Sequence, residues 1–263
     1  MAKDSKVRSI DPDGELKRRR GVYLLPNLIT TAALFAAFYA IVAAANGHFI
    51  KAALAIYAAF ILDTLDGRVA RWTRSESEFG AQYDSLSDMV AFGVAPALVA
   101  FFWALKGLGQ FGWVVAFIYV ACAGLRLARF NTSGDNATFT GLASPSAAAI
   151  VASTVWIWSE TAGPDPSIMR AVATALMTAA VSLLMVSPFT YFSPKEMHLK
   201  GRRPFFVLVA AVLIFAVILV NPPLVLLICF GLYALSGPAG FLWQRYRPER
   251  SKRDPTQHAD TGT

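Results

Sequence analysis

Charge, histidine and cysteine are all scarce in this sequence. Only 16% of the 263 residues are charged, against roughly 25% in an ordinary soluble domain, and 56% are hydrophobic. The three histidines form no metal-ligand pattern, and Cys122 and Cys229 both lie inside apolar runs, so neither a disulfide framework nor a thiolate metal site is expected. With a mean hydropathy of +0.48, the composition is typical of a membrane protein.

Eight apolar windows are each about as long as the roughly 20 residues that a spanning helix needs. They cover residues 23–46, 48–65, 86–105, 111–130, 145–160, 166–187, 205–221 and 223–242. The fifth is short and rich in alanine and serine, so seven or six spans are the alternatives. The first 22 residues are charged, and the first apolar run is long enough to span the membrane. We therefore expect no cleavable signal peptide. The sequence thus predicts an all-α, polytopic membrane helical bundle.

Lysine and arginine are distributed unequally between the two sides of this bundle. With eight spans, one side keeps only Lys51, Lys106 and Arg170, while the other receives nearly all remaining basic residues. The positive-inside rule then predicts that both termini and the polar segment after the second span face the cytoplasm, with the protein in the cell (inner) membrane. The net charge of +7 indicates contact with anionic membrane lipids. No nucleic-acid partner is expected, because the basic residues flank spans.

Four aspartates stand out against this apolar background: Asp63, Asp66, Asp84 and Asp88. Spacings of three and four residues put each pair on one face of a helix. Carboxylates at membrane depth are costly and usually functional, and oxygen ligands favour hard cations such as Mg²⁺ or Mn²⁺. Two such ions bridged by aspartates are a common device for displacement at phosphorus. We therefore expect a site for two divalent cations, with Asp88 as the base for an attacking hydroxyl.

A cation or proton transporter is an alternative use of membrane aspartates. It would require ionisable residues on several spans and often an inverted repeat. The polar residues are instead confined to one face of the membrane, and no internal repeat is visible. Gly67 and Ala70 remove bulk beside Asp66, and Arg71 adds a cation suited to phosphate. These features favour a phosphoryl-group enzyme.

The segment Asp66-Gly67-x2-Ala70-Arg71-x8-Gly80-x3-Asp84-x3-Asp88, with Asp63 three residues earlier, resembles the signature of the CDP-alcohol phosphotransferase family. Its members are membrane enzymes that transfer a phosphatidyl or similar group from a CDP-linked lipid to an alcohol and release CMP. The resemblance implies a homodimer, two metals held by the four aspartates, and Asp88 as general base. It also implies a CDP-diacylglycerol site made by Asn27, Thr30, Asp66, Gly67, Ala70, Arg71, Ser77 and Gly80.

Three further elements resemble the bacterial phosphatidylserine synthase branch of that family. They are Arg126-Leu-Ala-Arg129-Phe-Asn131, Phe139-Thr-Gly141-Leu-Ala-Ser144-Pro145, and Leu184-Met-Val-Ser187 followed by Tyr191 and Lys195. This resemblance implies that L-serine is the acceptor, with candidate serine-binding residues Arg126, Arg129, Asn131, Ser144 and Lys195. Glycerol 3-phosphate, an inositol compound and choline are the alternative acceptors. A phosphorylated acceptor would need extra arginine or lysine, which the stretch 195–203 could supply, and choline would favour an aromatic cage.

Four segments are expected along the chain. Residues 1–22 form a cytoplasmic or interfacial segment, and 23–204 hold the six-helix core that the family resemblance implies. Residues 205–242 add two transmembrane helices, and 243–263 form a charged cytoplasmic tail that we expect to be disordered.

Overall fold

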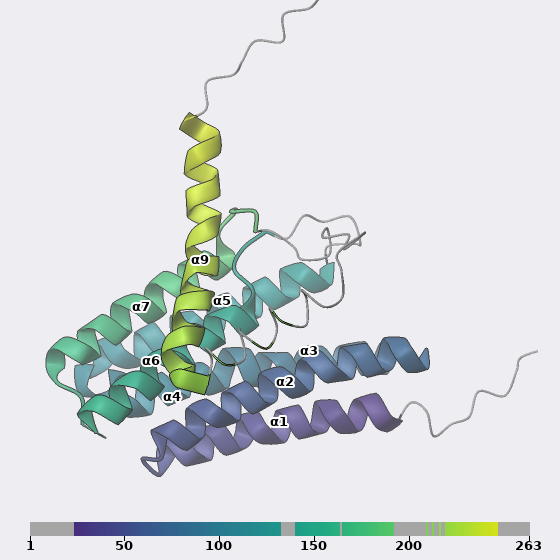
Figure 1. The fold of residues 1–263 in the computed structure, drawn as a ribbon, viewed down its shortest axis with the longest axis horizontal. Helices are drawn as coiled ribbons and strands as arrows, with labels where there is room; N and C mark the ends of the chain where they lie inside the picture. The colour runs from purple at the N-terminus through teal and green to yellow at the C-terminus, as the bar shows by residue number, and fades with distance from the viewer. Residues whose placement is uncertain are drawn as a thin grey trace, which may run out of the picture.

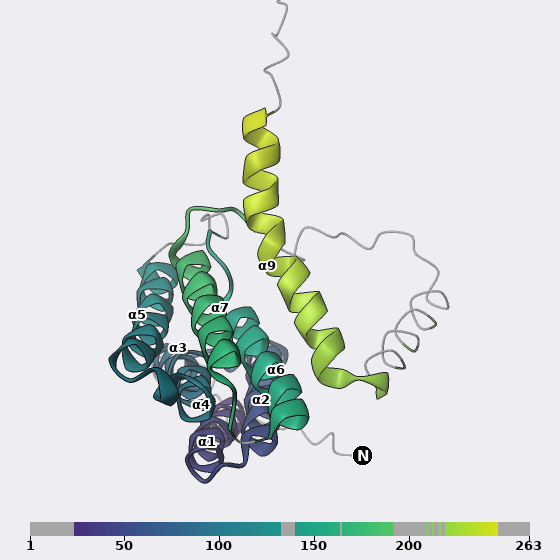
Figure 2. The ribbon, with the colours of Figure 1, turned by 90° about the vertical axis from the view of Figure 1, so that its left-hand side faces the viewer.

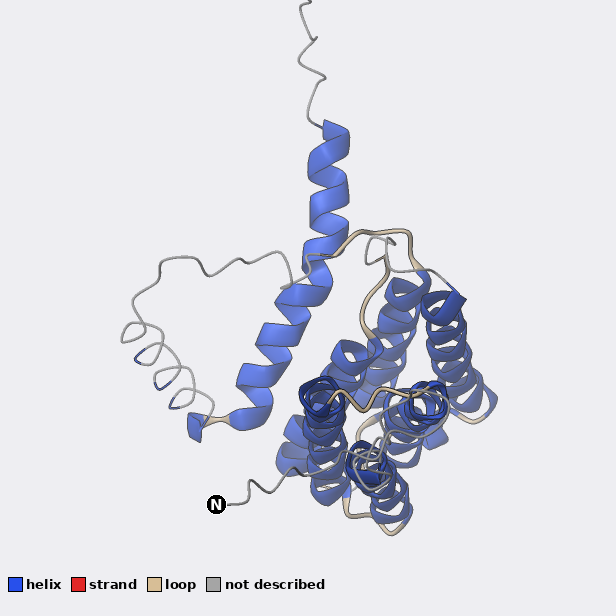
Figure 3. Ribbon diagram, turned by 90° about the vertical axis from the view of Figure 1, so that its right-hand side faces the viewer, coloured by secondary structure: helices blue, strands red, loops and turns tan. Residues whose placement is uncertain are grey.

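The computed structural model describes residues 24–132, 140–163, 165–191 and 219–246, together with positions 209, 212 and 216. Over these residues it is built from helices and contains no β-strand beyond a single bridge between Thr140 and Thr190 (Figure 3). Five of its helices are long and apolar enough to cross a membrane. The predicted all-α membrane bundle is confirmed.

The helices of the described chain follow the predicted spans closely (Figure 1). Their bounds are α1 Leu24–Ala45, α2 Phe49–Thr73, α3 Glu78–Asp88, α4 Ala95–Trp103, α5 Gln110–Thr132, α6 Ser144–Ala162, α7 Ile168–Val186 and α9 Pro222–Tyr246. The predicted span 205–221 falls almost entirely outside the described residues, and the segment 1–22 does so completely. Of the predicted tail 243–263, only residues 243–246 are described, and they belong to α9.

The helices α2 and α6 stand at predicted spans but are not among the five apolar candidates. In α2 the charged residues Lys51, Asp63 and Asp66 lower the hydropathy. In α6 every residue from 146 to 155 is buried, including Ser153 and Thr154. The helix α6 therefore lies inside the bundle, packing against α2, α4 and α9, whereas α2 keeps an exposed apolar face that includes Leu54 and Ile61. An interior helix faces protein and not lipid, so it tolerates small and polar residues.

Alanines line the antiparallel contact between α1 and α2, the most extensive helix pair in the structure. Ala37 and Ala40 of α1 and Ala52 and Ala53 of α2 are fully buried. Small side chains allow two helix axes to approach closely, and a turn with Gly47 at φ 78° reverses the chain. The start of α1 and the end of α2 consequently meet at the same end of the bundle.

The third helical rod is continuous from Glu78 to Trp103 but contains a π-helical turn at Met89–Val94. Pro96 has no N–H to donate to the Phe92 carbonyl four residues earlier. The buried Tyr119 hydroxyl donates to that carbonyl instead, at 3.1 Å. The predicted span began at residue 86; the helix starts earlier, at Glu78, because the Ser77 side chain caps it by accepting from the Gly80 N–H at 3.0 Å.

Candidate active site

The end of α2 and the start of α3 bring three of the predicted carboxylates together. Ligand oxygens of Asp63, Asp66 and Asp84 all lie within 4.8 Å of one another. Asp88, one helical turn beyond Asp84, lies outside this group of three, but its carboxyl group is within hydrogen-bonding distance of Asp63. The structure thus places all four in one continuous cluster, with Asp63 at its centre.

Two oxygens of this cluster have no partner in the described part of the chain. Asp66 is only 4% exposed, and both Asp66 Oδ2 and Asp84 Oδ1 are buried without a hydrogen bond. Such atoms cost free energy unless something pairs with them, and no arginine or lysine among the described residues does so. Several clustered carboxylate oxygens, free of nitrogen and sulfur, form the donor set that Mg²⁺ or Mn²⁺ prefers. The residues present therefore fit a divalent cation.

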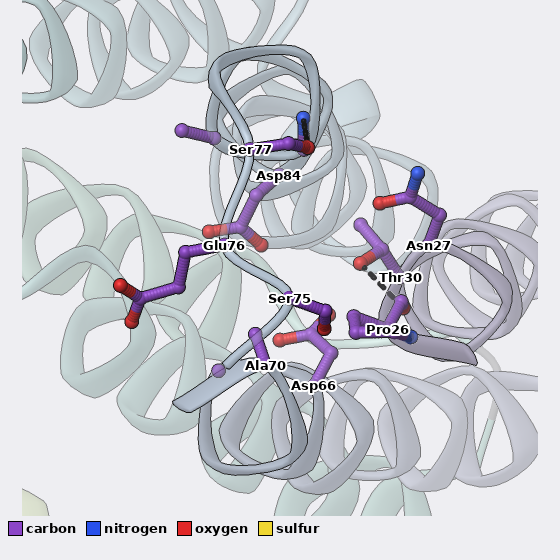
Figure 4. A pocket seen from close by; sticks show the side chains of 12 residues that line it. Pro26, Asn27, Thr30, Asp66, Ala70, Ser75, Glu76, Ser77 and Asp84 are labelled. Atoms are coloured by element: carbon purple, nitrogen blue, oxygen red, sulfur yellow. Dashed lines mark hydrogen bonds between the residues drawn. The ribbon is translucent and has the colours of Figure 1, made fainter. Parts of the chain in front are cut away.

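A cavity of about 320 Å³ opens beside the cluster, between α1, α2 and the start of α3 (Figure 4). The Asp66 and Asp84 side chains face it from opposite sides, and Asn27 and Thr30 from α1 form another wall. The residues that line it are Pro26, Asn27, Thr30, Asp66, Gly67, Ala70, Ser75, Glu76, Ser77, Gly80, Ala81 and Asp84. A volume of this size lies within the range of small-ligand sites.

Two glycines shape this cavity for different reasons. A side chain at Gly80 would meet the Ser77 hydroxyl at 3.0 Å and the Asn27 carboxamide at 3.3 Å, so glycine permits the close approach of α3 to α1. A side chain at Gly67 would meet nothing within 4 Å. Gly67 is therefore not required by packing, and the space in front of it is part of the cavity.

Seven of the eight residues predicted to bind CDP-diacylglycerol line the cavity. The exception is Arg71, which is exposed on α2 and is not among the lining residues. Ser75 and Glu76 also line the cavity, although the sequence indicated only a polar segment after the second span. Ser75 is buried and bonds the Thr73 hydroxyl at 2.6 Å. Ser75 and Glu76 lie in the turn that joins the two helices with the aspartates, and such a turn must border the site that these helices share. This position in the sequence could have identified both residues.

A second cavity of only about 10 Å³, room for about one water molecule, lies beside Asp88, where Arg126 of α5 and Ser144 of α6 meet. The guanidinium Nη1 of Arg126 donates to the Ser144 hydroxyl at 2.8 Å, and its buried Nε has no hydrogen-bond partner among the described residues. Arg126 also lies close enough to Asp88 for an electrostatic interaction. Two of the five predicted serine contacts are therefore adjacent to the proposed base.

The other three predicted serine contacts are placed differently. Asn131 near the end of α5 donates to the Ser85 hydroxyl of α3 at 3.1 Å, which ties these two helices together beside the aspartates. Arg129 is exposed on α5. Lys195 lies outside the described residues.

Comparison with known proteins identifies the family to which this chain belongs. The family model of CDP-alcohol phosphatidyltransferase matches residues 23–218, which include every helix around the cavity. The chain belongs to the CDP-alcohol phosphatidyltransferase family. The predicted family membership is confirmed, and the matched region extends beyond residue 204, the predicted end of the six-helix core.

Several curated members of the family are similar to this chain. The CDP-diacylglycerol–serine O-phosphatidyltransferase of Helicobacter pylori is 35% identical over 219 residues, covering 82% of this chain and 90% of that protein. The enzyme of the same name from Methanocaldococcus jannaschii is 34% identical and covers 69% of this chain and 80% of its own length. That of Mycobacterium bovis is 44% identical over 146 residues, about half of each chain.

Proposed function

We propose that the protein transfers the phosphatidyl group of CDP-diacylglycerol to the hydroxyl of L-serine and releases CMP. The observation that carries this proposal is the aspartate cluster, which borders a cavity of about 320 Å³ at Asp66 and Asp84 and the Arg126–Ser144 pair at Asp88. Relatives named as serine transferases support the choice of acceptor.

The cavity between α1, α2 and α3 would bind the CDP end of the lipid substrate. Asn27 and Ser77 offer a carboxamide and a hydroxyl for the nucleotide, and the open space in front of Gly67 allows backbone approach. The wall at Asp66 and Asp84 would face the pyrophosphate. Bare carboxylates repel a pyrophosphate, so the substrate requires cations at the cluster.

We assign this cation site to Asp63, Asp66 and Asp84, with Asp88 completing it through Asp63. When bound there, Mg²⁺ or Mn²⁺ would neutralise the pyrophosphate and stabilise the leaving oxygen of CMP. The experiment below compares CMP release with Mg²⁺ and with Mn²⁺ to determine which ion the enzyme uses.

Serine would enter on the side of Asp88 that Arg126 and Ser144 form. The guanidinium, with its unpartnered Nε, suits the serine carboxylate. Asp88 would accept the proton of the serine hydroxyl while that oxygen forms a bond to the lipid-side phosphorus. The bond between this phosphorus and the oxygen of CMP breaks, so CMP leaves with the displaced electron pair.

The proposal includes the predicted setting of the enzyme. The site and both termini face the cytoplasm from the cell membrane, which the lysine and arginine distribution supports. The segment 23–204 is the catalytic core, 205–242 adds two further spans, and 1–22 and 243–263 flank them at the cytoplasmic face. A homodimer is proposed from the family resemblance, and cross-linking of the protein in membranes would test it.

The decisive experiment measures CMP release by the purified full-length protein with CDP-diacylglycerol and either Mg²⁺ or Mn²⁺. L-Serine is compared with glycerol 3-phosphate, inositol 1-phosphate, inositol and choline. We expect release that depends on serine and that falls by a factor of at least about 10³ in Asp88→Asn, because the general base is lost. Asp165→Asn, the same substitution at an exposed position outside the site, should retain wild-type activity.

Three results would change the proposal. Release with another acceptor and not serine would keep the chemistry but reject the assigned acceptor. Full activity of Asp88→Asn would reject the assigned base. Failure to release CMP with every acceptor would reject the transferase proposal itself.

A further inference from the structure

The helix α3 carries Asp84 and Asp88, but little apolar burial holds it in place. Ser87 is its only buried residue, and its two large apolar side chains, Phe79 and Leu86, are 70% and 68% exposed. Carboxylates of like charge on α2 and α3 also repel one another. Hydrophobic burial therefore contributes little to the direction in which the two aspartates of α3 point.

Two side-chain hydroxyls on one face of α3 attach this helix to α1. The Tyr83 hydroxyl lies 2.9 Å from Thr31 Oγ1. Because Thr31 donates its own proton to the Asn27 carbonyl at 2.7 Å, Tyr83 is the donor in the bond between them. One turn later, Ser87 donates to the Thr30 carbonyl at 3.3 Å, and both of these residues are buried. The helix α3 is thus bonded to α1 at two successive turns.

Each of these hydroxyl-bearing residues immediately precedes an aspartate of the cluster. One residue turns an α-helix by about 100°, so the face with Asp84 and Asp88 is about 100° from the face that is bonded to α1. Beyond the aspartate face, Ser85 accepts a hydrogen bond from Asn131 of α5 at 3.1 Å. The helix α3 therefore lies between α1 and α5 (Figure 2), and side-chain hydrogen bonds on both flanks oppose its rotation.

The stretch of α1 that accepts these bonds is also a wall of the cavity. Asn27 and Thr30 line the cavity, and Asp66 and Asp84 face it from opposite sides (Figure 4). The same helix packs closely along α2 through fully buried alanines. The helix α1 is therefore a common support for both carboxylates, and the bonds from α3 to α1 hold Asp84 in position across from Asp66.

We propose that Tyr83 and Ser87 are positioning residues whose hydrogen bonds to α1 hold Asp84 and Asp88 in the orientation that a divalent cation requires. The inference deepens the proposed function and rests on the cation site assigned there. Each residue acts through the rotation of α3, because ligands that are already oriented bind a cation more tightly than ligands that binding must first orient.

The test is Mn²⁺ binding to the purified full-length protein without either substrate, with free Mn²⁺ measured by electron paramagnetic resonance. We expect Tyr83→Phe and Ser87→Ala each to raise the Kd for Mn²⁺ about fivefold, as for the loss of one hydrogen bond. Two matched controls should keep the wild-type Kd. They are Tyr39→Phe at an exposed position of α1 and Ser236→Ala on α9, whose hydroxyl donates within its own helix.

Thr31→Val provides an independent variant, because it removes the oxygen that accepts from Tyr83 and changes no residue of α3. It should raise the Kd for Mn²⁺ as much as Tyr83→Phe does. The double variant should bind no more weakly than either single variant, since both changes break the same bond. A merely structural role would instead lower the midpoint of thermal unfolding of the metal-free protein and leave the Kd for Mn²⁺ unchanged.

The outcomes separate this inference from the proposed function. Wild-type affinity for Mn²⁺ in Tyr83→Phe or in Ser87→Ala rejects the positioning role of that residue, while serine-dependent CMP release by the wild type still upholds the proposed function. Weaker Mn²⁺ binding by the variants, without CMP release by the wild type, supports the inference and rejects the transferase proposal. A wild type that does not bind Mn²⁺ rejects the inference together with the assigned cation site.

Discussion

Gly67 offers a substitution that should make the protein more stable and less active at once. A methyl group there would meet no atom within 4 Å, so Gly67→Ala removes no packing. Alanine in a helix interior is favoured over glycine by about 1 kcal/mol, and the free energy of unfolding should rise by about this amount. The same methyl group projects into the space that we assign to CDP. Crowding of a filled site costs about 1–3 kcal/mol, so kcat/KM for CDP-diacylglycerol should fall about tenfold or more.

The assay combines the midpoint of thermal unfolding in detergent with CMP release at varied CDP-diacylglycerol. Gly231→Ala is the matched control, because a methyl group at this position of α9 also meets nothing within 4 Å. It should give a comparable gain in stability at wild-type activity. A wild-type KM for CDP-diacylglycerol in Gly67→Ala would refute the placement of the nucleotide, and a loss of stability would refute the open space beside Gly67.

Two further predictions concern the cation and the packing of α5. Millimolar Mg²⁺ or Mn²⁺ should raise the midpoint of thermal unfolding, because a ligand present at 100 times its Kd stabilises the native state by about 2.7 kcal/mol. Asp66→Asn should abolish this shift and Asp165→Asn should keep it; an unchanged shift in Asp66→Asn would argue against the assigned ligands. Gly112→Ala should prevent recovery of monodisperse protein in gel filtration, since its Cβ would lie 1.8 Å from the Leu105 carbonyl oxygen. Normal recovery of this variant would contradict the close approach of α5 to that backbone.

The carboxylate cluster could be predicted because it depends on local spacing. Residues three or four apart on a helix share a face, so Asp63 with Asp66 and Asp84 with Asp88 had to form two pairs. Which oxygens meet across the helix pair depends on the relative height of α2 and α3, and no local pattern encodes that height. The grouping of three aspartates, with Asp88 joined through Asp63, therefore emerged only from the structure.

The same distinction explains what was missed elsewhere. Hydropathy identified the helix positions, but it could not show that α6 is an interior helix, because burial by other helices and burial by lipid favour similar residues. The contact of Tyr191 with Gly237 joins positions far apart in the chain. A glycine in an apolar helix has no local signature that distinguishes a docking site from an ordinary small residue.

The number of residues in the π-helical turn at Met89–Val94 determines the direction around the helix axis in which Asp84 and Asp88 point relative to α4. Each residue of an α-helix turns the chain by about 100°. A π-helical turn can absorb the loss of one residue by reverting to α-helix, so deleting two residues here would rotate the segment with Asp84 and Asp88 by about that angle relative to α4. Since α4 is fixed in the core by Ala97 and Val99, the carboxylates would swing away from α2. The deletion could leave a well-packed bundle with a dismantled site. Chain length between the aspartates and α4 is thus set by the chemistry that the helix must present, and not by the stability of the helix itself.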